Sequence, residues 1–178
     1  MHKKVLSEIS LTSGSLSKNS LVENDIVHFH FFNDFALLSL KKKKRNKYND
    51  FELSYHQHHS WILDYIRDKF NVQEQISLIP KTTYGSIHFF GESSLKRNHM
   101  DTYDSKHSSD YVVIYMVQGK GDLILEWKDH RNTQKDLVIP IIGGKYVVFS
   151  ANIDYFFTPN KSTDIRTIIT WNCDIIKQ

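Results

Sequence analysis

Apolar and polar residues alternate along much of the C-terminal half of this chain. Within residues 111–117, Tyr111, Val113, Tyr115 and Val117 share one face of an extended segment, because successive side chains of a strand point to opposite faces. Similar short apolar segments cover residues 123–127, 137–142, 145–150 and 166–171, and Gly residues separate several of them. Short strands at this spacing predict an antiparallel sandwich or barrel.

The N-terminal half has a different pattern. Residues 51–70 carry apolar side chains at helical spacing, which predicts one helix, or two with a break near Ser60. Residues 25–40, 72–79 and 82–90 are typical of strands. Residues 1–24 are polar and Ser-rich, so we expect a loose tail there and a single domain over residues 25–178. The predicted fold class is β-rich α+β.

Composition narrows the functional classes. The chain has 178 residues, 40% of them hydrophobic, which suits one globular domain with a real core. The net charge of +3 is too small to indicate nucleic-acid binding. Most of the positive charge lies in Lys41-Lys42-Lys43-Lys44-Arg45. This basic segment is either a patch for an acidic partner or, more commonly, a solvated connection.

Cys173 is the single cysteine, so no disulfide can form within the chain. Neither a secretory signal nor a membrane-spanning apolar stretch is present in the sequence. These features favour a reducing compartment, and we expect a cytoplasmic protein without a membrane partner.

Several histidines invite a metal interpretation. His28 and His30 share one face of a predicted strand and could bind a metal, although such a pair is more often the polar face of an edge strand. His56, His58 and His59 would not share one helix face, which disfavours structural zinc.

A stronger pattern begins at His99-Met100-Asp101. A histidine and a carboxylate two residues apart point to the same side of a strand, so both can reach one ion. Further on, Arg166 interrupts an apolar strand, and a buried guanidinium is costly unless an anion meets it. The C-terminal half therefore offers a candidate metal pair and a candidate carboxylate clamp.

The order of these motifs over residues 80–173 resembles the iron(II)/2-oxoglutarate oxygenase superfamily, especially its small prolyl-hydroxylase-like phage and bacterial members. The matching positions are His99 and Asp101, Tyr115, Gly119-Lys120-Gly121, Pro140, Gly144, Phe149, Thr158-Pro159-Asn160, Arg166 and Asn172. The resemblance implies a double-stranded β-helix, a jelly-roll-like core with an N-terminal helix packed on it.

The resemblance also implies cofactors and roles. His99 and Asp101 would belong to a facial triad for Fe(II), and the cosubstrate would be 2-oxoglutarate. Arg166 would pair with the far carboxylate of 2-oxoglutarate, or else form a structural ion pair with a core carboxylate. Tyr115 would either donate a hydrogen bond to the same carboxylate or fill the core. Asp at position 101 favours hydroxylation.

One position departs from the family pattern, because Tyr155 stands where the distal metal histidine is expected. Three alternatives follow: a weaker two-ligand site, recruitment of His88 or His107, or loss of iron binding. The sequence therefore predicts an iron(II)/2-oxoglutarate-dependent dioxygenase, a hydroxylase. The alternatives are a degenerate β-helix module that binds a carboxylate or a protein without turnover, and a subunit that keeps the fold for assembly. Neither the substrate, a small molecule or a peptide, nor the oligomeric state follows from the sequence.

Overall fold

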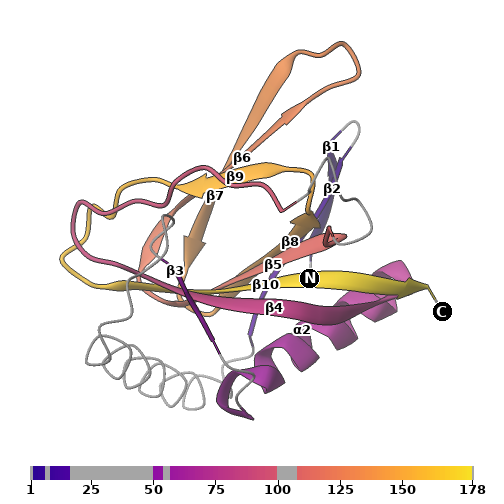
Figure 1. Ribbon diagram of the computed structural model, residues 1–178, viewed down its shortest axis with the longest axis horizontal. Coiled ribbons are helices and arrows are strands. Elements are labelled where there is room, and N and C mark those ends of the chain that lie inside the picture. Colours follow the sequence, from indigo (N-terminus) through magenta and orange to yellow (C-terminus); the bar gives the residue numbers. More distant parts are fainter. Residues whose placement is uncertain (1, 7–8, 17–49, 54–56, 100–107, 178) are drawn as a thin grey trace.

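The computed structural model describes residues 2–6, 9–16, 50–53, 57–99 and 108–177. These residues form two antiparallel sheets and one long helix (Figure 1). The elements are β1 (His2–Leu6), β2 (Ile9–Ser15), β3 (Asp50–Glu52), α2 (Gln57–Glu74), β4 (Ile76–His88), β5 (Tyr111–Gln118), β6 (Lys120–Lys128), β7 (Gln134–Ile142), β8 (Lys145–Ser150), β9 (Asp154–Phe157) and β10 (Arg166–Lys177).

The two sheets differ in size. The larger has seven strands in the order β1-β2-β8-β5-β10-β4-β3, and the smaller has three in the order β7-β6-β9. In Figure 1 the smaller sheet lies over one side of the larger sheet, and α2 lies on the opposite side. The predicted β-rich α+β class is thus confirmed, as are the predicted strands of the C-terminal half.

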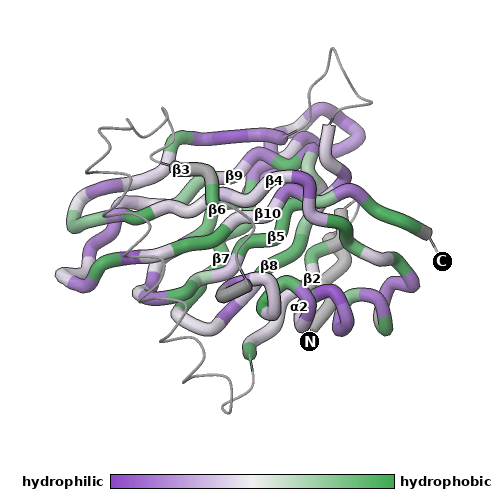
Figure 2. Tube along the Cα trace, turned by 60° about the horizontal axis from the view of Figure 1, so that its bottom comes forward, coloured by the Kyte–Doolittle hydropathy of each residue, from purple (hydrophilic) through white to green (hydrophobic). Residues whose placement is uncertain are grey.

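The central strands of the seven-stranded sheet are buried on both faces, and strand β5 shows how. Val113, Tyr115 and Val117 join a core cluster with α2, whereas Val112 and Ile114 join a second cluster with the three-stranded sheet. Figure 2 shows the hydrophobic segments gathered along the central strands. Full burial of one aliphatic side chain contributes about 1.5–3 kcal/mol. The two clusters together therefore fix which side of each strand faces the second sheet.

The helix begins later than the sequence predicts. Phe51 lies in β3, where it pairs with Gly85 of β4, and α2 runs from Gln57 to Glu74 without a break at Ser60. The prediction of a helix from residue 51 was wrong because pairing at a sheet edge supplied backbone partners that local spacing does not reveal. The helix is followed by Gln75, whose positive φ of 56° terminates it.

The two strands predicted at 72–79 and 82–90 form one strand, β4, whereas residues 72–74 belong to α2, so the prediction of a strand from residue 72 was wrong. The register against β10 shifts beside Pro80, since Asn172 pairs with Thr82 and Cys173 pairs with Pro80. Lys81 is therefore the extra residue of a bulge, which accommodates a proline that has no N–H to donate. The break in the apolar pattern at Pro80 and Lys81 thus marks a bulge within β4 and not the end of a strand.

The tail predicted for residues 1–24 is wrong where the structure describes it. Residues 9–15 form β2, which extends the larger sheet by pairing Leu11 with Phe149 of β8. Leu11 is buried, whereas the strand as a whole is polar, so its sequence carries little apolar alternation. Three other predictions concern segments outside the described residues. They are the rest of the tail (17–24), the strand at 25–40 with His28 and His30, and the basic segment.

Two further expectations concern membranes and redox chemistry. None of the helical residues that the structure describes forms a span long and apolar enough to cross a membrane. Cys173 is a free, buried thiol.

Candidate functional site

Two residues of the predicted metal site meet between the sheets. The Nε2 atom of His99 lies 2.8 Å from the hydroxyl oxygen of Tyr155, at hydrogen-bonding distance. Tyr155 comes from β9, and its backbone exchanges two 2.9 Å hydrogen bonds with Arg97. The segment that carries His99 is thus held beside β9. The predicted proximity of position 155 to His99 is present in the structure.

The surroundings of His99 keep its imidazole neutral. Burial, assisted by the positive charge of Arg97, lowers the pKa of His99 to about 4. The Arg97 guanidinium lies 5.4 Å from the centre of the Tyr155 ring. A neutral imidazole is the form that ligates a metal, but here its Nε2 is engaged by a phenol.

The rest of the predicted metal set is described only in part. Asp101 and His107 lie outside the described residues. Within the described ranges, no three His, Cys, Asp or Glu side chains gather as a metal-binding group. His88, the other histidine considered as a third ligand, directs its Nδ1 atom to Arg166.

Arg166 is fully buried and lies at the start of β10, directly opposite His88 of β4. His88 Nδ1 accepts hydrogen bonds from Nε (3.0 Å) and Nη2 (2.9 Å) of Arg166. The face of the guanidinium lies 5.1 Å from the Phe157 ring centre. Nη1 has no hydrogen-bond partner among the described residues, so part of a buried charge stays unmatched.

The charge of Arg166 persists despite its burial. Burial lowers the pKa of Arg166 to about 10, while the negative charge of Asp122 acts in the opposite direction. The guanidinium therefore stays protonated at neutral pH. In the part of the chain that the structure describes, the hydrogen-bond partners of the guanidinium are His88 Nδ1 and, at 3.5 Å, the backbone oxygen of Glu92.

The Gly-x-Gly motif has a physical reason at each glycine. Gly119 has a φ of 88° in the turn between β5 and β6, a conformation that glycine adopts without strain. A Cβ atom added to Gly121 would lie 2.5 Å from Nη1 of Arg166. Glycine at position 121 therefore allows Nη1 of Arg166 to lie where a side chain would begin.

Asn160, part of the Thr158-Pro159-Asn160 motif, and Ser94, which the sequence did not single out, hold this region together. The side-chain amide of Asn160 donates to the backbone oxygens of His88 (3.1 Å) and Asp164 (2.8 Å). The hydroxyl of Ser94 accepts from the backbone N–H of Phe157 at 2.7 Å. These contacts span more than 60 residues in the case of Ser94 and Phe157, so no local pattern predicts them.

Tyr115 is not brought to this region. Its side chain packs in the cluster that contains α2, on the face of the larger sheet opposite to Ile168 and Phe157. Burial raises the pKa of its phenol well above the ordinary value. A hydrogen bond from Tyr115 to a ligand held by Arg166 does not fit this arrangement, and core filling is the role that does.

The two candidate groups lie along one strand. Tyr155 and Phe157 both contribute to the cluster between the sheets, and they contact His99 and Arg166 respectively. Alternate residues of a strand are about 6.5 Å apart.

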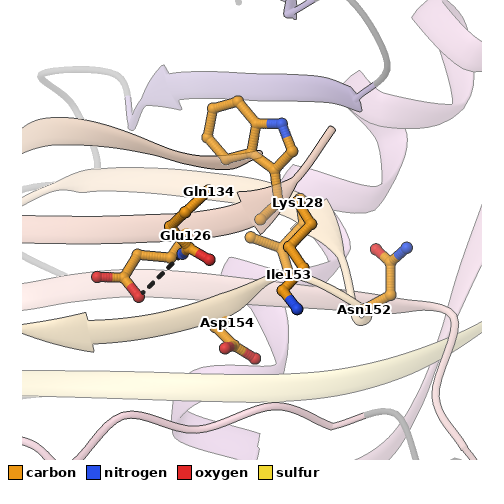
Figure 3. Close-up of a pocket in the computed structure, with 7 residues that line it drawn as sticks. Glu126, Lys128, Gln134, Asn152, Ile153 and Asp154 are labelled. Atoms are coloured by element: carbon orange, nitrogen blue, oxygen red, sulfur yellow. Dashed lines mark hydrogen bonds between the residues drawn. The ribbon is translucent and has the colours of Figure 1, made fainter. Parts of the chain in front are cut away.

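A separate hollow of about 430 Å³ lies at the smaller sheet (Figure 3). Its residues include Glu126, Gln134 and Asp154. Lys96 Nζ lies 3.0 Å from the Asp154 carboxylate and also bonds Glu126. The hydrogen bonds that Lys96 donates to Glu126 and then to Asp154 raise the pKa of Lys96. The Glu126 and Asp154 carboxylates are thus already paired with Lys96.

Solved structures identify the architecture. A viral collagen prolyl hydroxylase from Paramecium bursaria Chlorella virus-1, in complex with 2OG, has a TM-score of 0.62 at 14% identity, over 92% of this chain and 96% of that one. This chain has the fold of the 2-oxoglutarate oxygenases. By sequence, the chain matches no protein-family model and no curated protein.

Two further structures agree on this fold. A prolyl-4-hydroxylase from Pseudomonas putida has a TM-score of 0.61 at 12% identity, covering 94% of this chain and 95% of that one. The non-heme alpha-ketoglutarate-dependent carbocyclase SnoK from nogalamycin biosynthesis has a TM-score of 0.65 at 8% identity, covering 92% and 79%. The oxygenase fold thus extends over nearly the whole chain.

Proposed function

We propose that this protein is an iron(II)/2-oxoglutarate-dependent dioxygenase of the hydroxylase type. The observation that carries the proposal is the buried guanidinium of Arg166, whose Nη1 lies against Gly121 and has no hydrogen-bond partner among the described residues. A buried charge of this kind is stabilised when an anion completes its hydrogen bonds. The oxygenase fold makes 2-oxoglutarate the anion of choice.

Arg166 would hold the far carboxylate of the cosubstrate. The guanidinium offers two parallel N–H donors, a geometry that matches a carboxylate and that lysine does not reproduce. Phe157 covers one face of the guanidinium and is itself buried, which excludes water and strengthens the interaction. The role of this end of the site is to bind and orient.

His99 and Asp101 would hold the iron. His99 fits this role because its imidazole is neutral and contacts Tyr155, which lies two strand residues from Phe157, the residue beside Arg166. Tyr155 would offer an oxygen at the third position instead of an imidazole nitrogen. Bound iron and cosubstrate would together supply oxygen-dependent oxidation of a substrate C–H bond, with succinate as coproduct.

The finer features of the fold agree with this assignment. The two facing antiparallel sheets, with α2 packed on the outer side of the larger one, suit a double-stranded β-helix of jelly-roll type. An Fe(II)-dependent reaction and a single buried thiol also suit a reducing cytoplasm. The substrate would be a small molecule or a peptide.

One contact favours a second function. The hydrogen bond between Tyr155 and His99 occupies the nitrogen that would bind iron. A module that has lost the metal, but still binds a dicarboxylate through Arg166, would keep the buried guanidinium and show this contact. This degenerate binding module is the alternative to turnover.

Conversion of 2-oxoglutarate to succinate separates the two functions. Purified protein, loaded with Fe(II) without oxygen and then exposed to air, is expected to form succinate even without a substrate. The His99→Ala variant should form none, and the exposed-site variant His130→Asn should match the parent. Binding of 2-oxoglutarate without iron-dependent succinate would establish the degenerate module. Absence of both binding and turnover would overturn both functions.

A further inference from the structure

His88 is the immediate neighbour of the Arg166 guanidinium and sets which part of it is available. The side edge of a guanidinium carries Nε and Nη2, and its end edge carries Nη1 and Nη2. The single nitrogen His88 Nδ1 accepts from both atoms of the side edge, at 3.0 and 2.9 Å. The end edge is left for another partner.

The contact also defines the protonation state and the tautomer of His88. A guanidinium has only donors, so Nδ1 of His88 must present its lone pair, and the imidazole is neutral with its proton on Nε2. A carboxylate in the place of this imidazole would hold the same edge but would cancel the positive charge. A neutral acceptor holds the guanidinium and leaves its charge for a ligand.

The other contacts of Arg166 point to the same end edge. Nη2 reaches the backbone oxygen of Glu92 only at 3.5 Å, a long contact, and Nη1 faces Gly121. The Cζ atom of the guanidinium lies over the Phe157 ring. Asp122 acts on Arg166 through its negative charge. Among the described residues, the end edge is therefore the edge that keeps an unmatched hydrogen-bond donor, Nη1.

We propose that His88 is a positioning residue for ligand binding. Its neutral imidazole clamps the side edge of Arg166 and aims the end edge at a ligand carboxylate without neutralising the guanidinium. The inference rests on the proposed function, because it names the group that prepares the carboxylate-binding end of that site. His88 itself touches neither the ligand nor the metal.

The backbone supports this role. His88 and Arg166 are directly paired across β4 and β10, so their side chains leave the sheet side by side. Asn160 donates to the backbone oxygen of His88 and so fixes the end of β4. The imidazole and the guanidinium are therefore held by two independent elements.

Three substitutions at position 88 separate the effect of a hydrogen-bond acceptor for Arg166 from the effect of a negative charge. His88→Asn places an amide oxygen near the position of Nδ1 and keeps a neutral acceptor. His88→Asp keeps the acceptor and adds a negative charge. His88→Leu removes the acceptor. His130→Asn, at an exposed position of the β6–β7 turn, is the matched control.

The probe is glutarate, titrated into metal-free protein in the presence of a chelator and followed by calorimetry. Glutarate has both carboxylates of 2-oxoglutarate but lacks the keto oxygen that would bind iron, so the test is independent of turnover. We expect His88→Asn to bind within about threefold of the parent, and His88→Asp and His88→Leu to bind at least about tenfold more weakly. Thermal unfolding of each variant reports whether the protein is folded.

The inference is supported if His88→Asn keeps the glutarate affinity of the parent while His88→Asp or His88→Leu loses it. Equal glutarate affinity in all three variants would overturn the inference, as would an affinity that follows the thermal stability of the variants alone. If one variant does not fold, the comparison of His88→Asn with the other decides. A parent that binds no glutarate also overturns the inference. A parent that binds glutarate but forms no succinate contradicts the proposed turnover and leaves the role of His88 standing.

Discussion

Two residues, Tyr155 and Arg166, carry most of the chemistry inferred for this protein. Tyr155 lies 2.8 Å from Nε2 of His99, and Arg166 is a buried cation whose Nη1 has no hydrogen-bond partner among the described residues. In the proposed site, the first contact would limit metal binding and the second would favour an anion. Substitutions at these positions test the two ends of the site separately.

Tyr155→His should raise the affinity for Fe(II). An imidazole nitrogen is a better Fe(II) ligand than a protonated phenol, and removal of the phenol frees His99 Nε2. We expect at least about a tenfold gain by anaerobic metal titration, with more succinate formed from 2-oxoglutarate. Tyr155→Phe is the control, since it frees His99 without adding a ligand. Weaker iron binding in Tyr155→His would show that position 155 is not at the metal.

Arg166→Ala should abolish 2-oxoglutarate binding. Loss of a buried charged partner costs about 3–5 kcal/mol, which corresponds to a weakening of several hundredfold or more. Calorimetry with the metal-free protein measures this directly. Arg131→Ala, which removes an exposed arginine from the β6–β7 turn, should bind like the parent. Equal affinity of Arg166→Ala and the parent would mean that the guanidinium is structural.

At the scale of elements, the connection from β5 to β6 leads the chain from the larger sheet to the smaller one beside Arg166. Gly119 makes the turn of this connection, and Gly121 lies close against the guanidinium. The connection thus links turn geometry to the proposed carboxylate-binding end of the site. A change in β6 should alter ligand binding more than stability.

Gly121→Ala should weaken dicarboxylate binding by about tenfold. Its new Cβ would lie 2.5 Å from Nη1, and the end of the flexible Arg166 side chain would have to move. Lys120→Ala is the control in the same strand, because Lys120 is exposed. Glutarate titration of both variants, with thermal unfolding alongside, checks the expectation. A large loss of stability without a change in affinity would contradict it.

The N-terminal strand β2 is an element that the sequence did not predict. Leu11 is 6% exposed and belongs to the core between the sheets. Leu11→Ala should therefore cost about 2–5 kcal/mol in the free energy of unfolding. A substitution in a loose tail would change the free energy of unfolding by no more than about 0.5 kcal/mol. Ser15→Ala, at an exposed position of β2, should have an effect of this size. Urea denaturation distinguishes the two.

At the scale of the molecule, the seven-stranded sheet separates two cores. One faces α2 and contains Trp171 and Cys173, and the other faces the smaller sheet and contains Tyr155 and Phe157. The candidate site lies in the second core, while the first supports the sheet from behind. Opening the first core requires α2 to leave the sheet.

Chemical labelling of Cys173 reports on the separation of α2 from the sheet. Its thiol is fully buried, and burial, reinforced by the charge of Asp174, raises its pKa to about 12. The thiolate is the reactive form, so a thiol reagent at pH 8 should label the folded protein far more slowly than the protein in urea. The labelling rate should follow global unfolding. Rapid labelling under native conditions would contradict the packing of α2 on β10.

The sequence by itself determined the strands of the C-terminal half and the isolation of Arg166 in an apolar strand. Both are local properties: side-chain alternation follows from strand geometry, and a charged residue among apolar neighbours is visible in any window. The approach of position 155 to His99 also followed from the family-like order of motifs. These features needed no knowledge of which strands become neighbours.

Only the tertiary structure decided the remainder. Alternation places Tyr115 and Arg166 each on one face of a strand, but it does not say which face meets α2 and which meets the smaller sheet. The pairing of His88 with Arg166 joins residues 78 apart, and β2 and β3 exist as strands because neighbouring strands supply their hydrogen bonds. Faces and partners of this kind depend on long-range packing, which no local pattern of residues encodes.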